Sequence, residues 1–222
     1  MNARAVIACC ALSMLYGLVH ASGVGVPADG VASAARVAPG IASQAPALRA
    51  DASTDPTAAG VPVPAAVRAG LSQARLNGQG VLRWFGLKIY EARLWTSSAG
   101  LDPARFEQAA FALELRYARA LDGAAIAQAS HKEITRLGFG SPEQRAHWLD
   151  AMHRIFPDVA DGDRITGVNR PDRGVAFFRN DTPIGEIDAP GFARAFFAIW
   201  LDRRTVAPDV RAALLGTSTA VK

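Results

Sequence analysis

The chain has 222 residues, 50% of them hydrophobic, and a formal net charge of +4. This composition is that of a globular protein with a real core, and it excludes a disordered or collagen-like chain. The arginines are scattered among acidic residues, whereas a nucleic-acid surface needs a basic stripe with stacking aromatics, so we expect no nucleic-acid partner.

The first 21 residues have the layout of a secretory signal peptide. A positive start containing Arg4 precedes an uncharged apolar run at residues 5–19, and a small-residue cleavage site ends at Ala21. The rival interpretation, a membrane anchor, needs roughly 20 apolar residues, which is more than this run supplies. We therefore predict cleavage and export to the periplasm or the medium, with no transmembrane span left afterwards.

The predicted mature protein begins with a segment that cannot fold by itself. Residues 22–60 are mostly Ala, Gly, Ser, Pro and Val without any aromatic residue, which predicts a flexible linker. A single domain follows at 61–216, with a disordered tail at 217–222. Both cysteines, Cys9 and Cys10, lie in the signal segment, so the exported domain would have no disulfide.

The domain opens with predicted strands. Residues 80–85 and 87–95 carry β-branched and aromatic residues at short spacing, which is typical of strands. Residues 111–118 alternate with period two, and this places four apolar or aromatic side chains on one face: Phe111, Leu113, Leu115 and Tyr117.

Two helices are predicted next. Residues 122–137 have a helical apolar face and end before Gly138, a natural C-terminal stop. The second helix has the clearest signals: Ser141 caps it, Pro142 occupies its first position, and Gln144 completes a capping box. Its apolar stripe consists of Trp148, Leu149, Met152, Ile155 and Phe156, and Pro157 ends it.

Strands then return as a β-meander. Residues 163–169 and 174–180 read as strands, and the pair Asn180 and Asp181 predicts a tight turn into a strand at 182–188. Strands and helices occur in blocks without βαβ alternation. This order predicts an α+β fold, an antiparallel β-sheet with helices packed on one face.

Residues 190–202, PGFARAFFAIWLD, predict a helix that is apolar almost all round, interrupted only by Arg194. Such a helix must be covered on most sides. Thirteen residues would span roughly 20 Å, which is too short for a bilayer core of about 30 Å. We therefore expect this helix between the sheet and the other helices, followed by a last short helix from Pro208 to Gly216.

The order of elements and several strings resemble the bacterial chalcone isomerase-like proteins over residues 76–216. The strings are LNGQGVLRWFGLKIYEARLW, GVAFFRNDTPIGEI, and GFARAFFAIWLD with its trailing PDVRAALLG. The resemblance implies a chalcone isomerase fold with a cleft for a hydrophobic ligand between sheet and helices. The family includes plant enzymes that cyclise chalcones and noncatalytic relatives that bind fatty acids.

The resemblance does not extend to the plant enzymes' polar cleft residues. Their positions fall on or next to Leu82, Tyr90, Asp122 and Ala129, and none keeps the enzyme's residue. Arg83 lies one place from the expected arginine, but a shift of one residue in a strand turns a side chain to the opposite face. This absence favours a noncatalytic protein, and no catalytic residue is assigned.

Four residues are candidates for ligand binding. A hydrophobic carboxylate needs an apolar slot with a cation and a hydroxyl group. Tyr90 and Thr182 could supply hydroxyl groups, while Arg194 and Arg83 could supply a cation. Three of them also have a structural interpretation, because Tyr90 could pack across strands, Thr182 could form a turn and Arg194 could extend into water.

No motif for a metal or cofactor is found, so none is expected. His147 and His153 are six residues apart, off the i, i+4 spacing of a helical metal pair, and there is no nucleophile elbow or phosphate loop. The leading hypothesis is an exported, noncatalytic protein that binds a fatty acid or other hydrophobic carboxylate. The alternatives are an isomerase or intramolecular lyase on an unidentified substrate, and a structural or interaction module of the envelope.

Overall fold

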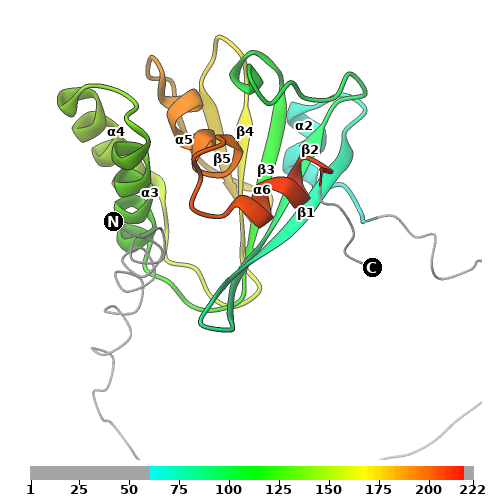
Figure 1. The fold of residues 1–222 in the computed structure, drawn as a ribbon, viewed down its shortest axis with the longest axis horizontal. Coiled ribbons are helices and arrows are strands. Elements are labelled where there is room, and N and C mark those ends of the chain that lie inside the picture. Colours follow the sequence, from blue (N-terminus) through cyan, green and yellow to red (C-terminus); the bar gives the residue numbers. More distant parts are fainter. Residues whose placement is uncertain (1–60, 218–222) are drawn as a thin grey trace, which may run out of the picture. The chain divides into compact units, whose positions relative to one another are not determined.

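The computed structural model describes residues 61–217 (Figure 1). The predicted signal peptide, the predicted linker and all but the first residue of the predicted tail lie outside this range. Within it, no helix combines the length and the apolar character needed to cross a membrane.

One antiparallel sheet carries all six strands in chain order, as the meander pattern predicts. Helices are inserted between β3 and β4, which still pair as neighbours, with Leu113 opposite Gly167. The strands are β1 (Arg75–Trp84), β2 (Leu87–Thr96), β3 (Phe111–Tyr117), β4 (Arg164–Asn169), β5 (Val175–Arg179) and β6 (Thr182–Ile187).

The predicted helices form, and their ends lie within two residues of the predicted ones. The capping box is complete, because the Ser141 Oγ accepts a hydrogen bond from the Gln144 N–H and the Gln144 Oε1 accepts one from the Ser141 N–H. Gly138 ends the preceding helix with φ of 80°. The helices are α3 (Gly123–Leu137), α4 (Pro142–Ile155), α5 (Phe192–Leu201) and α6 (Pro208–Leu214), with a short 3-10 turn at Phe106–Gln108.

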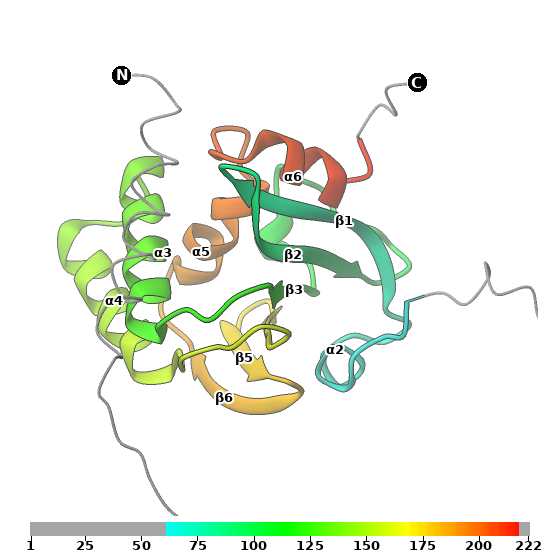
Figure 2. The ribbon, with the colours of Figure 1, turned by 90° about the horizontal axis from the view of Figure 1, so that it is seen from below.

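The apolar helix α5 lies between the sheet and α3, and this confirms the expectation from its sequence (Figure 2). Phe192 and Phe197 are fully buried, and the Phe197 ring lies 4.6 Å from the Phe111 ring of β3. Arg194 is the exposed residue of this helix. Burial of each phenylalanine contributes about 1.5–3 kcal/mol, so the sandwiched position of α5 is a main source of stability.

Helix α6 lies directly on β1, where two glycines make room for it. A Cβ atom at Gly78 would overlap the carbonyl oxygens of Ala213 and Leu214, and one at Gly80 would crowd Val210. The Asn77 Nδ2 donates to the Leu214 carbonyl oxygen at 2.7 Å. This close packing fixes α6 on the same face of the sheet as α5.

A further helix, α2 (Ala65–Gly70), packs on the opposite face against β3 and β4. Its sequence carries no clear helical signal, because six residues are too few to show a helical period. Its Val67 is fully buried, and Gly70 lies against the Val168 side chain. Part of the second face of the sheet is therefore covered as well.

Asp163, just before β4, is expected to stabilise the fold in a pH-dependent way. Its carboxylate accepts hydrogen bonds from the Ala160 N–H, the Asn180 Nδ2 and the Arg179 Nη2, and these bonds lower its pKa from 3.8 to about 2. Because the folded-state pKa is depressed, this stabilisation is present above pH 3.8 and is lost as the pH falls towards 2.

Replacing Asp163 with asparagine should therefore lower Tm above pH 4, with a difference from wild type that narrows between pH 4 and pH 2. Thermal melts across this range measure it. Asp161→Asn, at an exposed position two residues earlier, is the control and should leave Tm unchanged. A Tm difference for Asp163→Asn that stays constant with pH would contradict this account.

Candidate functional site

A cavity of about 110 Å³ lies on the helix-covered face of the sheet, between the strands and helices α3 and α5. Strands β1, β2, β3 and β4 form its floor, and the segment 205–207 before α6 lines one side. Its wall is mainly apolar, with Leu82, Leu115, Ile126, Ala129, Phe196 and Ile199 among the lining residues. The surface is that of a slot for a hydrophobic group.

Most polar groups at the cavity already have hydrogen-bond partners. The Tyr90 hydroxyl accepts a hydrogen bond from the Trp200 Nε1 at 3.0 Å, across 110 residues of sequence. The Ser130 hydroxyl donates to the Ile126 carbonyl oxygen, and the Thr205 hydroxyl donates to the Ile199 carbonyl oxygen. These bonds hold the walls in place rather than offering groups to a ligand.

Tyr117 is the exception among the cavity's hydroxyl groups. Its ring packs edge-on to Tyr90 at 6.2 Å, and its hydroxyl has no hydrogen bond to another described residue. Burial raises the pKa of this phenol strongly, and the neighbouring Tyr90 raises it further. Tyr117 therefore stays neutral at physiological pH and can donate one hydrogen bond to a bound molecule.

Glu133 of α3 is the charged residue in the cavity wall, with 4% of its surface exposed. Its Oε2 pairs with the Arg136 Nε at 2.9 Å, which balances the charge from outside the lining. No arginine or lysine belongs to the lining formed by residues 61–217. An ionised carboxylate inside the cavity would therefore lack a direct cationic partner.

The structure brings one of the four predicted ligand-binding residues, Tyr90, to this cavity. Arg83 is exposed near the end of β1, where its Nη1 donates to the Gly86 carbonyl oxygen. Thr182 is exposed at the start of β6. Arg194 is exposed on α5, with its guanidinium 5.9 Å from the centre of the Phe139 ring. These three side chains lie away from the lining.

Three of the four positions matched to the plant enzymes' cleft residues do line the cavity, namely Leu82, Tyr90 and Ala129. The fourth, Asp122, is exposed at the N-terminus of α3. Sequence reasoning missed Tyr117 as a site residue, although the period-two pattern of β3 placed it on the inner face. Of these positions, Leu82 and Ala129 present apolar side chains to the cavity, and Tyr90 presents a phenol.

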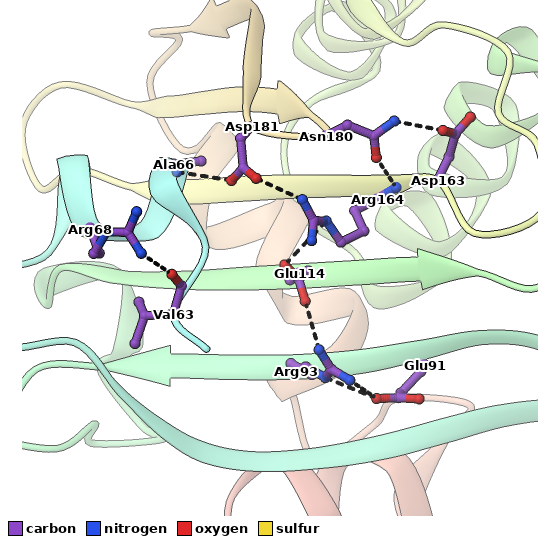
Figure 3. Close-up of polar contacts among 10 residues, drawn as sticks. All are labelled: Val63, Ala66, Arg68, Glu91, Arg93, Glu114, Asp163, Arg164, Asn180 and Asp181. Carbon is purple, nitrogen blue, oxygen red and sulfur yellow. Dashed lines mark hydrogen bonds and ion pairs between the residues drawn. The ribbon is translucent and has the colours of Figure 1, made fainter. Parts of the chain in front are cut away.

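A second cluster of ionisable residues lies on the opposite face of the sheet (Figure 3). Glu114 is fully buried there, 3.4 Å from the Arg93 Nη1 and 3.9 Å from the Arg164 Nε. Arg93 also pairs with Glu91, and Arg164 with Asp181. Burial raises the pKa of Glu114, although Arg164 and Arg93 oppose that rise.

This charge cluster links elements instead of forming a binding site. The Asp181 Oδ1 accepts a hydrogen bond from the Ala66 N–H at the start of α2, so the chain of charges connects α2 to β2, β3 and β4 (Figure 3). Within residues 61–217, no group of three His, Cys, Asp or Glu side chains is arranged to hold a metal ion. The apolar cavity is accordingly the candidate site.

Comparisons with known proteins identify the family and the fold. A family model described as chalcone isomerase-like matches residues 55–216. The fold is similar to the crystal structure of a fatty-acid binding protein from Arabidopsis thaliana, with a TM-score of 0.50 and 12% sequence identity over 64% of this chain and 87% of that one. No curated protein matches the sequence. At this identity the structural likeness concerns the fold alone.

Proposed function

The chain belongs to the chalcone isomerase-like family, and from that premise we propose that it is a noncatalytic protein that binds a small hydrophobic molecule. The first candidate is a fatty acid or another hydrophobic carboxylate. The observation that carries the proposal is the apolar cavity between sheet and helices, with the Tyr117 phenol among its lining residues. The similar Arabidopsis protein is a fatty-acid binding protein, and this supports a hydrophobic ligand for the present chain.

The size of the cavity limits what it holds. Its 110 Å³ is smaller than the roughly 300 Å³ of a usual ligand pocket, and it is nearer to the engineered cavity of about 150 Å³ that takes up benzene. A ring or the end of a short acyl chain fits this space. We therefore propose that the cavity takes the hydrophobic end of a ligand and that a longer chain extends past the lining residues.

The lining also bears on the ligand's polar group. A buried carboxylate without a cation is costly, and the lining charge, that of Glu133, is negative. A carboxyl group would bind inside the cavity in its protonated form, or it would remain outside in water. A carbonyl or ester oxygen could accept the Tyr117 hydrogen bond at no such cost.

Thermal melts of the purified full chain with octanoic acid and with methyl octanoate test the proposal. Both ligands should raise Tm, the acid more at pH 5 than at pH 8, because the protonated form binds without a buried charge. Native mass spectrometry should detect one bound molecule per chain. Repeated recovery of empty protein, with no Tm change for either compound, would contradict it.

Tyr117→Phe is the matching variant, because it removes one hydroxyl and keeps the ring. It should weaken the ester by about 3- to 10-fold, the value of one hydrogen bond. Removing the buried hydroxyl should not lower Tm of the empty protein. Equal binding of the ester by wild type and Tyr117→Phe would remove Tyr117 from the site while leaving the cavity as a candidate.

We also propose that the protein is exported, on the basis of the predicted signal at residues 1–21. Fractionation of expressing bacteria, followed by N-terminal sequencing of the soluble exported form, tests this. Sequencing should find a start after Ala21. An uncleaved chain that stays in the cytoplasmic fraction would contradict it.

A further inference from the structure

The turn between β1 and β2 exposes apolar side chains to solvent. Phe85 has 83% of its surface exposed, Leu87 has 48% and Val81 has 39%, and these are the exposed large hydrophobic residues of the described range. Figure 1 shows this end of the hairpin projecting past α6. We call residues 81–88 the hairpin tip. The apolar side chains of the tip are exposed to solvent instead of being packed into the core.

The backbone at the hairpin tip disfavours the residue that occupies it. Phe85 and Gly86 form a two-residue turn with φ of 47° and 78°, in the left-handed region that bulky side chains avoid. The equivalent turn between β5 and β6 has the same geometry and uses Asn180 and Asp181, the residue types that such turns prefer. Phe85 is therefore not explained by the turn.

Packing does not explain Phe85 either. Its ring contacts the edge of the Trp84 ring at 4.6 Å and is otherwise in water. A strained, exposed aromatic residue points to a contact outside the folded chain. That contact must accept the Phe85 ring, which is the most exposed of the apolar side chains of the tip.

The charges of the hairpin tip indicate the chemistry of the partner. Arg83 and Lys88 lie directly opposite each other in the register, and like charges in this arrangement repel. Residues 81–88 contain these two cations and no acidic residue, which gives a charge of +2. Lys88 pairs with Glu91 outside the tip, while the Arg83 guanidinium contacts only the Gly86 carbonyl oxygen among described residues. The tip therefore suits an anionic surface.

We propose that the hairpin tip inserts Phe85 into the interface of an anionic lipid bilayer, with Arg83 and Lys88 on the lipid headgroups. Aromatic rings at the hydrocarbon boundary with cations behind them are the usual features of such contacts. A lipid surface fits better than a protein, because one hairpin end is small against the roughly 1,000 Å² of a stable protein interface. The inference does not depend on the ligand proposed above.

Bilayer contact can be measured with the full chain and phosphatidylglycerol vesicles whose acyl chains carry bromine. Bromine quenches nearby tryptophan, and Trp84 is the half-buried reporter, whereas Trp95, Trp148 and Trp200 are 6% exposed or less. Wild type should be quenched. Trp84→Phe should lose most of the quenching while still sedimenting with the vesicles.

Phe85→Asn separates folding from lipid binding. Asparagine suits the turn, so Tm should rise by about 2–4 °C, while the apparent affinity for the vesicles should fall about 10-fold or more. Arg83→Glu should also weaken binding, whereas Arg75→Glu, at the exposed far end of the same strand, should not. Vesicles of phosphatidylcholine alone should bind weakly.

Three outcomes would overturn the proposal. If Phe85→Asn were quenched as strongly as wild type, the contact would lie in another part of the chain. The N-terminal apolar segment, which every variant shares, would be one such part. Absence of quenching with every vesicle would exclude bilayer contact. Wild-type dimers that Phe85→Asn dissociates, without quenching, would make a second copy of the chain the partner of the hairpin tip.

Discussion

Replacing Ala129 with phenylalanine is expected to weaken ligand binding in the cavity strongly while the fold stays intact. Ala129 of α3 lines the cavity, and a benzyl side chain there would occupy the space of a ring-sized ligand. A ligand excluded from this space loses roughly 2–3 kcal/mol of apolar burial. This corresponds to about 30- to 150-fold in Kd. Titration with methyl octanoate measures the loss.

Ala124→Phe is the matched control, because Ala124 lies on the same helix at an exposed position. It should bind the ester as wild type does. Ala129→Phe should keep its Tm or raise it, because the added ring fills the void. Undiminished binding by a folded Ala129→Phe protein would exclude this cavity as the site, even if the chain binds hydrophobic molecules elsewhere.

Replacing Arg164 with methionine is expected to lower the free energy of unfolding by about 2–3 kcal/mol at pH 7. Removing one partner of a buried ion pair usually costs about 3–5 kcal/mol. Here Glu114 keeps Arg93 as a partner at 3.4 Å, and Arg164 is partly exposed, so the expected loss is smaller. Asp181 also loses its partner at 2.6 Å. Urea unfolding of the two proteins measures the difference.

The pH dependence identifies Glu114 as the cause. Burial raises the pKa of Glu114 above 4.5, so ionisation costs stability as the pH rises through the folded-state pKa. Loss of Arg164 removes the largest opposing influence, so the destabilisation should shrink below pH 4.5, where Glu114 is protonated. Glu114→Gln in the Arg164→Met background should restore at least half of the stability at pH 7.

Arg179→Met provides the comparison at a more exposed ion pair. Arg179 pairs with Asp163 at 2.7 Å, with 39% of its side chain exposed. Pairs of this kind contribute about 0–1 kcal/mol, so the loss should be clearly smaller than for Arg164→Met. If Arg164→Met and Arg179→Met lowered the free energy of unfolding equally, burial of Glu114 would not be the cause of the destabilisation by Arg164→Met.

The local elements could be predicted from the sequence because their signals are local. The capping box at Ser141 and Gln144 needs only neighbouring residues, and it forms as expected. Residues 190–202 are apolar almost all round, so a helix formed by them had to be buried on both sides. The sheet buries one side of α5, and α3 buries the other. Arg83 was predicted as a ligand-binding cation although strand alternation turned it away from the cleft, and the structure places it outside the cavity.

Other features depended on elements that are far apart in the chain. Helix α2 has too few residues for a periodic signal, and its position follows from contacts with β3, β4 and Asp181. The charges around Glu114 come together only through the sheet register, because Arg93 and Arg164 are on different strands. An alternating strand pattern predicts a face, but not which charges will meet on it.

The sequence by itself determined most of the elements, their order, the antiparallel sheet and the inner face of β3, because periodicity and caps act over a few residues. The tertiary structure alone decided the cavity. Tyr90, Tyr117 and Trp200 meet there from two strands and one helix, and the volume left between them depends on how closely α3 and α5 approach the sheet. A void is the difference between packed volumes, and no local pattern of residues specifies that difference.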